Sequence, residues 1–262
     1  MYNYLDMLKT TILFCAALLC LNATDVMSQN KNKVIAHRGA WKNTGATENS
    51  IGALEHAIKL GCYGAEFDVH MSSDSVIFVH HDHAIKGTHI EKTSAAELSA
   101  IKLSNGESLP MLENYLKTGG KQKKTRLILE IKTSSISKER SLALAAKCVE
   151  LVKKYKVEKI TDYIAFDFDV CLKVKELAPK AHVEYLNGDK TPAEIKAAGL
   201  DGTDYHFSVY KKNEGYLKEL QDLKLSTNVW TVNDEATMKW FLERNVDFIT
   251  TNEPELLLKI TK

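Results

Sequence analysis

The alternation of short apolar runs with amphipathic segments is the feature of this sequence that most restricts its fold. Eight runs have the composition of buried strands, at residues 34–36, 65–69, 127–131, 163–166, 182–186, 199–202, 227–232 and 246–250. Helical patterns lie between them, at residues 50–60, 141–155, 169–177 and 235–244. Strands that alternate with helices form a parallel sheet, and eight such units favour a closed (β/α)₈ barrel, the TIM barrel, of the α/β class.

One interval is longer than a single strand–helix unit requires. Between Asp68 and Glu130 lie a further strand-like run at residues 76–79 and a helical pattern at residues 94–101. We expect a small insertion after the second strand, over about residues 70–125. Such an insertion would lie over the barrel mouth, where barrel enzymes build their sites.

The first residues have the pattern of an export signal. An apolar run at residues 11–21 follows Lys9, and it is shorter than the roughly 20 residues that a membrane span needs. Small residues, Val26 and Ser28, precede a possible cleavage point before Gln29. The sequence therefore predicts a secretory signal peptide at residues 1–28, a barrel domain at residues 29–262, and a periplasmic or secreted protein. An uncleaved N-terminal anchor is the alternative.

Composition and charge exclude several classes of protein. The chain is 44% apolar and 26% charged, which is enough apolar material for a core and argues against disorder. Its 35 basic and 34 acidic side chains give a formal net charge of +1, so the protein lacks the basic field that nucleic-acid binding uses. We expect no nucleic-acid partner and no stable membrane span after signal cleavage, and the oligomeric state stays open.

Three carboxylates are predicted to meet at one end of the barrel. Glu66 and Asp68 are two residues apart on a strand, so their side chains point to the same face. Glu130 has the corresponding place near the end of another strand. Carboxylates this close repel one another unless a cation lies between them, and an all-oxygen site suits Mg²⁺ or Ca²⁺. The alternative is that each acid is exposed or paired with a lysine, as Glu130 could be with Lys132.

Histidines supply the candidate acid/base groups. His37 and Arg38 directly follow the first strand, where a histidine can exchange protons near neutral pH and an arginine can bind phosphate through two hydrogen bonds. Residues 80–83 read His-His-Asp-His, but zinc is disfavoured because adjacent side chains of an extended chain point to opposite faces and no cysteine is near. We expect His81 to be the second acid/base group, with His80 on the opposite face and His83 on the same face.

In chain order these motifs resemble those of the glycerophosphodiester phosphodiesterase family, whose barrel fold is shared with phosphatidylinositol-specific phospholipases C. The motifs are His37-Arg38-Gly39, Glu48-Asn49-Ser50, Glu66-x-Asp68, His81-Asp82, Leu109-Pro110-x-Leu112-Glu113, Leu129-Glu130-Ile131-Lys132, Val229-Trp230-Thr231-Val232-Asn233 and Ile249-Thr250-x-x-Glu253-Pro254. Each motif alone is weak, whereas eight in order across the chain are specific.

The resemblance implies a role for each matching residue. It implies a catalytic pair in His37 and His81, ligands of one divalent cation in Glu66, Asp68 and Glu130, and substrate contacts from Arg38, Lys132 and Trp230. Two positions depart from the family pattern. His83 stands where proline is usual after His-Asp, and Asn252 stands at or near a usual aspartate in the last motif. Both departures leave the implied ligands and histidines in place.

The expected function is therefore an exported, metal-dependent phosphodiesterase. It would hydrolyse glycerophosphodiesters to an alcohol and glycerol phosphate, with Mg²⁺ or Ca²⁺ as cofactor and histidine acid/base catalysis. Two alternatives stay open: a phospholipase D that acts on lysophospholipids or sphingolipids, and a catalytically silent barrel that binds phosphodiesters.

Overall fold

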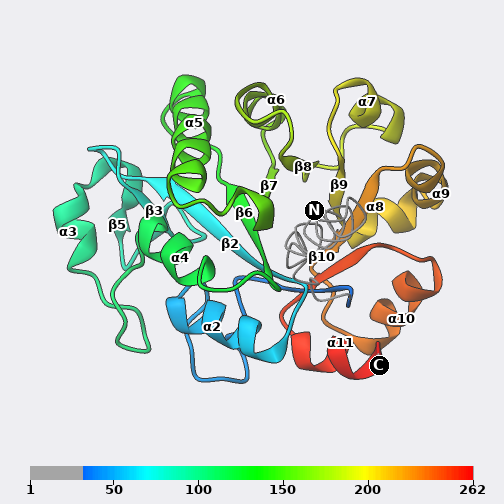
Figure 1. Ribbon diagram of the computed structural model, residues 1–262, viewed down its shortest axis with the longest axis horizontal. Coiled ribbons are helices and arrows are strands. Elements are labelled where there is room, and N and C mark those ends of the chain that lie inside the picture. The colour runs from blue at the N-terminus through cyan, green and yellow to red at the C-terminus, as the bar shows by residue number, and fades with distance from the viewer. Residues whose placement is uncertain (1–31, 262) are drawn as a thin grey trace, which may run out of the picture.

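The structure, a computed structural model, describes residues 32–261, so the predicted signal peptide lies outside the described residues. Eight parallel strands form a closed barrel (Figure 1): β1 (Val34–Ala36), β2 (Gly64–Met71), β6 (Arg126–Ile131), β7 (Thr161–Ala165), β8 (His182–Tyr185), β9 (Gly202–His206), β10 (Ser226–Trp230) and β11 (Phe248–Thr251). The barrel closes because β1 pairs with β11 on one side and with β2 on the other. The predicted (β/α)₈ barrel is confirmed.

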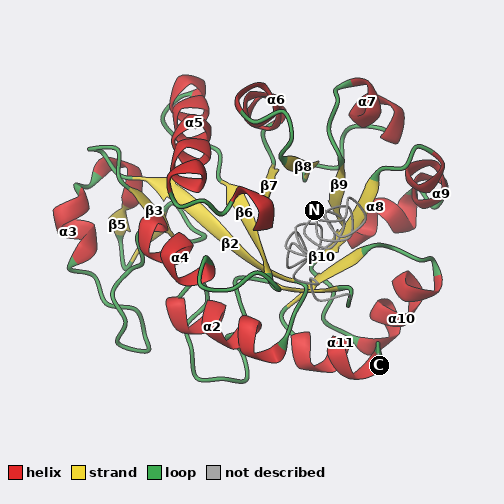
Figure 2. Cartoon of the chain, in the orientation of Figure 1, coloured by secondary structure: helices red, strands yellow, loops and turns green. Residues whose placement is uncertain are grey.

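Helices surround the strands on the outside of the barrel, as Figure 2 shows. They are α2 (Ile51–Leu60), α4 (Leu112–Gly119), α5 (Lys138–Lys154), α6 (Phe168–Leu177), α7 (Pro192–Ala197), α8 (Phe207–Lys212), α9 (Gly215–Asp222), α10 (Glu235–Glu243) and α11 (Pro254–Ile260), with a 3₁₀ turn at Glu158–Ile160. Helix α2 begins where the Ser50 side chain accepts a hydrogen bond from the Ala53 amide, and it ends at Gly61 in the left-handed conformation. Within residues 32–261 no helix combines the length and apolar character needed to cross a membrane.

The strand predicted at residues 199–202 is wrong in position, because β9 begins only at Gly202. Gly199 has a positive φ of 72° and ends the turn after α7, so the chain is not yet extended there. The true strand carries polar Thr203 and Asp204 and therefore lacks the apolar run that marks its neighbours. The structure also contains α4, α7, α8, α9 and α11, at positions where the sequence patterns gave no specific helix.

The insertion after β2 forms a small layer of its own beside the barrel (Figure 1). It contains β3 (Ile77–Val79), which pairs antiparallel with β2, the two-stranded sheet of β4 (Ala84–Ile85) and β5 (Thr88–His89), the 3₁₀ turn η1 (Ile90–Lys92) and helix α3 (Ala95–Ser99). A separate apolar cluster that includes Phe78, Ile90 and Leu98 stabilises it. The pairing of β3 with β2 places the chain after β3 beside the carboxyl end of the barrel.

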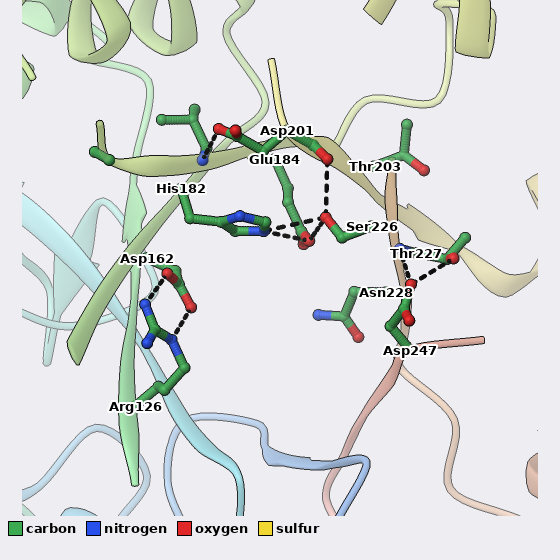
Figure 3. A network of polar contacts seen from close by, with 12 residues as sticks. Arg126, Asp162, His182, Glu184, Asp201, Thr203, Ser226, Thr227, Asn228 and Asp247 are labelled. Atoms are coloured by element: carbon green, nitrogen blue, oxygen red, sulfur yellow. Dashed lines mark hydrogen bonds and ion pairs between the residues drawn. The ribbon is translucent and has the colours of Figure 1, made fainter. Parts of the chain in front are cut away.

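A network of ion pairs and hydrogen bonds lies at the opposite, amino-terminal end of the barrel (Figure 3), where its residues line a cavity of about 640 Å³. Arg126 on β6 forms a two-pronged ion pair with Asp162 on β7. His182 on β8 lies 3.0 Å from Glu184 Oε1, and Ser226 on β10 donates to the same oxygen over 2.5 Å. These groups satisfy one another, so this end of the barrel is a polar closure of the fold, separate from the predicted site.

His182 makes the stability of the fold depend on pH. Burial alone would lower its pKa, but the hydrogen bond and charge of Glu184 outweigh it and raise the pKa to about 9. Because the unfolded pKa is about 6.5, this pair stabilises the fold fully below pH 6.5 and loses that effect as the pH rises through 9. We expect the Tm of the wild type to fall more between pH 6.5 and 9.5 than that of His182→Gln. Equal falls in both proteins, measured by thermal unfolding, would contradict this.

Candidate active site

The three predicted carboxylates converge at the carboxyl end of β2 and β6. Asp68 and Glu130 are register partners on these neighbouring strands, and Glu66 precedes Asp68 on the same face of β2. Ligand oxygens of Glu66, Asp68 and Glu130 all lie within 4.8 Å of one another, and the three residues are buried. The strand geometry thus brings together the acids that the sequence predicts.

Neighbouring residues hold these carboxylates in place. The Arg38 backbone amide donates to Glu66 Oε2 over 2.8 Å, in a turn where Arg38 has a positive φ of 56°. The Asn49 side-chain amide donates to Asp68 Oδ2 over 2.8 Å, and the Asp68 amide donates back to Asn49 Oδ1 over 3.1 Å. Gly39 follows Arg38 with a φ of 77°, and a Cβ there would lie 2.7 Å from the backbone of α2. The turn after β1 is therefore specific for glycine at this position.

Lys132 supplies a positive charge beside two of the acids. Its Nζ lies 2.8 Å from Glu130 Oε1 and 3.3 Å from Asp68 Oδ1. The sequence left open whether Glu130 is a metal ligand or a partner of Lys132. The ion pair is present. It does not use all the carboxylate oxygens, because Glu66 Oε1 is buried and has no hydrogen-bond partner within the described residues.

The pKa values of the acids show that one lysine does not neutralise the cluster. Burial and the charge of Asp68 raise the pKa of Glu130 to about 8. Burial and the same neighbour also raise the pKa of Glu66 above its usual range. The pKa of Asp68 is lowered to about 2, because Lys132 and other cations outweigh the effect of burial. A buried, partly unpaired set of carboxylate oxygens fits a hard divalent cation.

His37 lies at the rim of this cluster, directly after β1. Its Nδ1–H donates to Asn252 Oδ1 over 2.7 Å, and its Nε2 lies 4.0 Å from Glu66 Oε2. Burial and the charge of Arg38 lower the pKa of His37 to about 4, so the ring is neutral at physiological pH. The hydrogen bond to Asn252 leaves Nε2 as the nitrogen that can accept a proton.

His81 lies in the bend after β3 and lines the same cavity as His37. Its Nδ1–H donates to Asp82 Oδ1 over 2.7 Å, and His70 Nε2–H donates to the His81 backbone carbonyl over 3.0 Å. The hydrogen bond with His81 lowers the pKa of Asp82, so this partner stays ionised. Two supports thus hold His81, one on its ring and one on its backbone.

The two neighbouring histidines do not line the cavity. His80 contacts the site through its backbone amide, which donates to the Asp68 carbonyl over 2.9 Å. The His83 ring packs against His70, with ring centroids 4.9 Å apart, and its Nδ1 lies 3.7 Å from Glu91 Oε2. The chain bends at residues 81–83, so the assumption of an extended chain, with His83 on the same face as His81, does not apply.

These groups enclose a cavity of about 140 Å³ at the barrel mouth. Its lining residues are His37, Arg38, Glu66, His81, Glu130, Ile164, Phe166, Leu186, Asp204, Trp230, Thr231 and Thr250. The Trp230 ring meets Phe166 edge-on, with centroids 5.5 Å apart, and forms an aromatic wall. Arg38 reaches the cavity while its Nη1 donates to both oxygens of Glu48 over 3.0–3.1 Å. One face of the cavity is thus charged and the other is apolar.

Comparison with known proteins identifies the family of this chain. The profile of the glycerophosphoryl diester phosphodiesterase family matches residues 37–256. This chain belongs to that family. It is an enzyme, a glycerophosphodiester phosphodiesterase.

Three similar proteins illustrate the match. A glycerophosphodiester phosphodiesterase of Caldanaerobacter subterraneus subsp. tengcongensis is 26% identical over 88% of this chain and 98% of its own. The crystal structure of one from Parabacteroides distasonis is 45% identical, with a TM-score of 0.86, over 89% of this chain and 98% of that one. An Oleispira antarctica phosphodiesterase, solved with its product sn-glycerol-3-phosphate, shares the fold at 21% identity, with a TM-score of 0.73 over 87% and 95% of the two chains.

Residues outside the predicted set also contribute to the site. Asn49 and Asn252 fix Asp68 and His37, and both stand in motifs that the sequence analysis quoted without a role for these side chains. Asp204 lines the cavity from β9, the strand whose position the sequence analysis missed. In the sequence, Asp204 is an isolated acid between Thr203 and Tyr205. This pattern predicts a buried acid only when the strand register is known.

Asn252, the neutral hydrogen-bond partner of His37, leads to a prediction for the pH dependence of activity. Asn252→Asp would place a carboxylate at hydrogen-bond distance from Nδ1 and raise the pKa of His37 by about 1–3 units. If neutral His37 is needed for activity, the acid limb of kcat/KM should move to higher pH by about that amount. The pH–rate profiles of wild type and Asn252→Asp measure this shift. An unmoved acid limb would show that His37 is not the group whose protonation limits the reaction.

Proposed function

We propose that this glycerophosphodiester phosphodiesterase is exported, depends on one divalent cation and uses His37 and His81 as its acid/base pair. The supporting observation is their common cavity. Both histidines line it, together with Arg38, Glu66 and Glu130. A carboxylate cluster beside two proton-exchanging groups is the combination that hydrolysis of an anionic diester requires.

The cation-binding group would be Glu66, Asp68 and Glu130. Bound there, Mg²⁺ or Ca²⁺ would neutralise charge on the phosphate oxygens as the nucleophile approaches. Arg38 and Lys132 add fixed positive charge for the same phosphate, since Arg38 lines the cavity and Lys132 contacts two of the acids. Asn49 and the Arg38 amide keep the acids in the orientation that coordination needs.

The partners of the two histidines suggest how the roles divide. His37 donates to a neutral amide, and its burial favours the neutral ring, which suits a base. His81 donates to the ionised carboxylate of Asp82, an arrangement that suits a general acid. In this scheme His37 takes the proton of the attacking hydroxyl or water, and His81 protonates the leaving alcohol.

Two routes share this division of roles. A glycerol hydroxyl could attack phosphorus and form a cyclic phosphate, which water then opens with the histidines in exchanged roles. Direct attack by water would need each histidine once. Each proton transfer contributes about 10²–10⁴-fold to the rate.

Release of glycerol phosphate tests the proposal. The purified protein should hydrolyse soluble glycerophosphodiesters of several head groups, with activity lost in EDTA and restored by Mg²⁺ or Ca²⁺. A preference for micellar lysophospholipids would favour the phospholipase D alternative. Binding without turnover of any diester would favour the silent barrel.

The proposed export has its own test. If the signal is cleaved before Gln29, N-terminal sequencing of protein from its native host should begin at or near Gln29, outside the cytoplasm. A protein that starts at Met1 would contradict signal cleavage.

A further inference from the structure

Asp204 is a buried acid for which the proposed mechanism has no use. It lies in the middle of β9, in register with Asn228 on β10, and its side chain points into the barrel. Only 1% of the residue is exposed. Its carboxyl group shares a hydrogen bond with the Asn228 side chain, but Oδ1 is buried and has no hydrogen-bond partner among residues 32–261. Such an orphaned oxygen destabilises the fold.

In the described part of the chain, the charges that act most strongly on Asp204 are negative. Burial, with the acids Glu184 and Glu130 nearby, raises the pKa of Asp204 well above its usual range. The neighbouring polar residue Thr250 does not engage Oδ1, because its hydroxyl is bonded to Asn228 over 3.0 Å. Asp204 thus lines the cavity, and its buried Oδ1 has hydrogen-bonding capacity that the fold itself does not use.

The cavity around this oxygen has the dimensions and character of a polyol site. Its volume of about 140 Å³ suits a small polar group. Ile164, Phe166 and Leu186 offer apolar surface to carbon-bound hydrogens. Asp204 also fixes the Trp230 indole, because the Trp230 Nε1–H donates to the Asp204 backbone carbonyl over 2.8 Å.

We propose that Asp204 is a specificity-determining residue that hydrogen bonds a free hydroxyl of the glycerol arm of the substrate. This inference rests on the proposed function. A hydroxyl fits Oδ1 in either protonation state, because it donates to a carboxylate and accepts from a carboxyl group. The site then favours deacylated glycerol and rejects an arm that lacks the hydroxyl, since Oδ1 would stay unpaired.

The test compares three substrates on three proteins: wild type, Asp204→Leu and Asp204→Asn. The first substrate is glycerophosphocholine. In one analogue the terminal glycerol hydroxyl, which does not neighbour the phosphate ester, is replaced by hydrogen. In the other analogue the central glycerol hydroxyl is replaced by hydrogen. Wild type should prefer glycerophosphocholine over at least one analogue by about 10–10²-fold in kcat/KM. Asp204→Leu should lose activity on glycerophosphocholine by about that factor. It should keep its activity on the analogue that wild type disfavours. Asp204→Asn, which can still hydrogen bond, should keep most of the preference.

Stability separates this role from a structural one. Because Asp204→Leu removes an orphaned buried polar atom, its Tm should equal or exceed that of wild type. Thr203→Val is the matched control, since Thr203 lies next to Asp204 on β9 but bonds the Tyr210 hydroxyl over 2.9 Å, and its substrate preference should be unchanged.

Each other outcome overturns the inference. An Asp204→Leu variant that fails to fold, or that loses activity equally on all substrates, would show a structural or general role. One that changes only the preference between choline and ethanolamine head groups would place Asp204 at the leaving alcohol. Active wild type without any hydroxyl preference would refute this inference alone, whereas wild type inactive on every diester would refute the proposed function.

Discussion

His81→Ala is expected to lower kcat by at least about 10²-fold, while metal content stays near that of wild type. His81 lines the cavity and is held by Asp82 and by His70, so alanine removes a proton-exchanging ring without removing a carboxylate. His37→Ala should have a similar effect. The double variant should lose less than the product of the two losses, because both rings serve one reaction.

The neighbouring histidines are the controls. His80→Ala should keep most of the activity, because His80 contacts Asp68 only through a backbone amide that alanine retains. His83→Ala should lose less than His81→Ala, since His83 contacts the site only through His70 and Glu91. With a nitrophenyl leaving group, the histidine that protonates the leaving alcohol should become nearly dispensable, which we expect for His81. An inactive His80→Ala beside an active His81→Ala would mean that the motif is assigned one residue too late.

The parts of this structure that sequence can predict are those fixed by local periodicity. The same-face spacing of Glu66 and Asp68 follows from strand geometry alone, and Glu130 joins them because β2 and β6 are neighbours in the barrel. Apolar runs such as residues 127–131 mark barrel strands because both faces of a parallel strand are covered. The barrel and the carboxylate cluster could therefore be predicted together.

The supports of the site could not be predicted in the same way. His37 and Asn252 are 215 residues apart, and their contact depends on the closure of the barrel between β1 and β11. The histidines of residues 80–83 were assigned by assuming an extended chain, whereas the bend there depends on the insertion packed after β3. Asp204 is polar on a strand where apolar residues are the usual signal, so the apolar pattern did not mark the full strand.

Loss of any one ligand charge is expected to abolish most of the activity. Glu66→Gln, Asp68→Asn and Glu130→Gln should each lower kcat/KM by about 10³-fold, because a bound cation supplies several kcal/mol of charge stabilisation at the phosphate. Binding can be measured without turnover, since Mg²⁺ or Ca²⁺ at 100 times its Kd should stabilise the wild type by about 2.7 kcal/mol. The three variants should show little of the resulting Tm shift.

The raised pKa of Glu130 determines how the metal-induced Tm shift should depend on pH. Because that pKa is raised to about 8, the cation must displace a proton from Glu130 below pH 8, and the metal-induced Tm shift should grow from pH 6 to pH 8.5. Glu91→Gln is the matched control, since Glu91 is equally buried but its oxygens accept from Ser134, Ser135 and Arg140. It should keep the full metal-induced shift. Full activity after exhaustive chelation would instead leave Lys132 as the partner of these acids and exclude a cation from the mechanism.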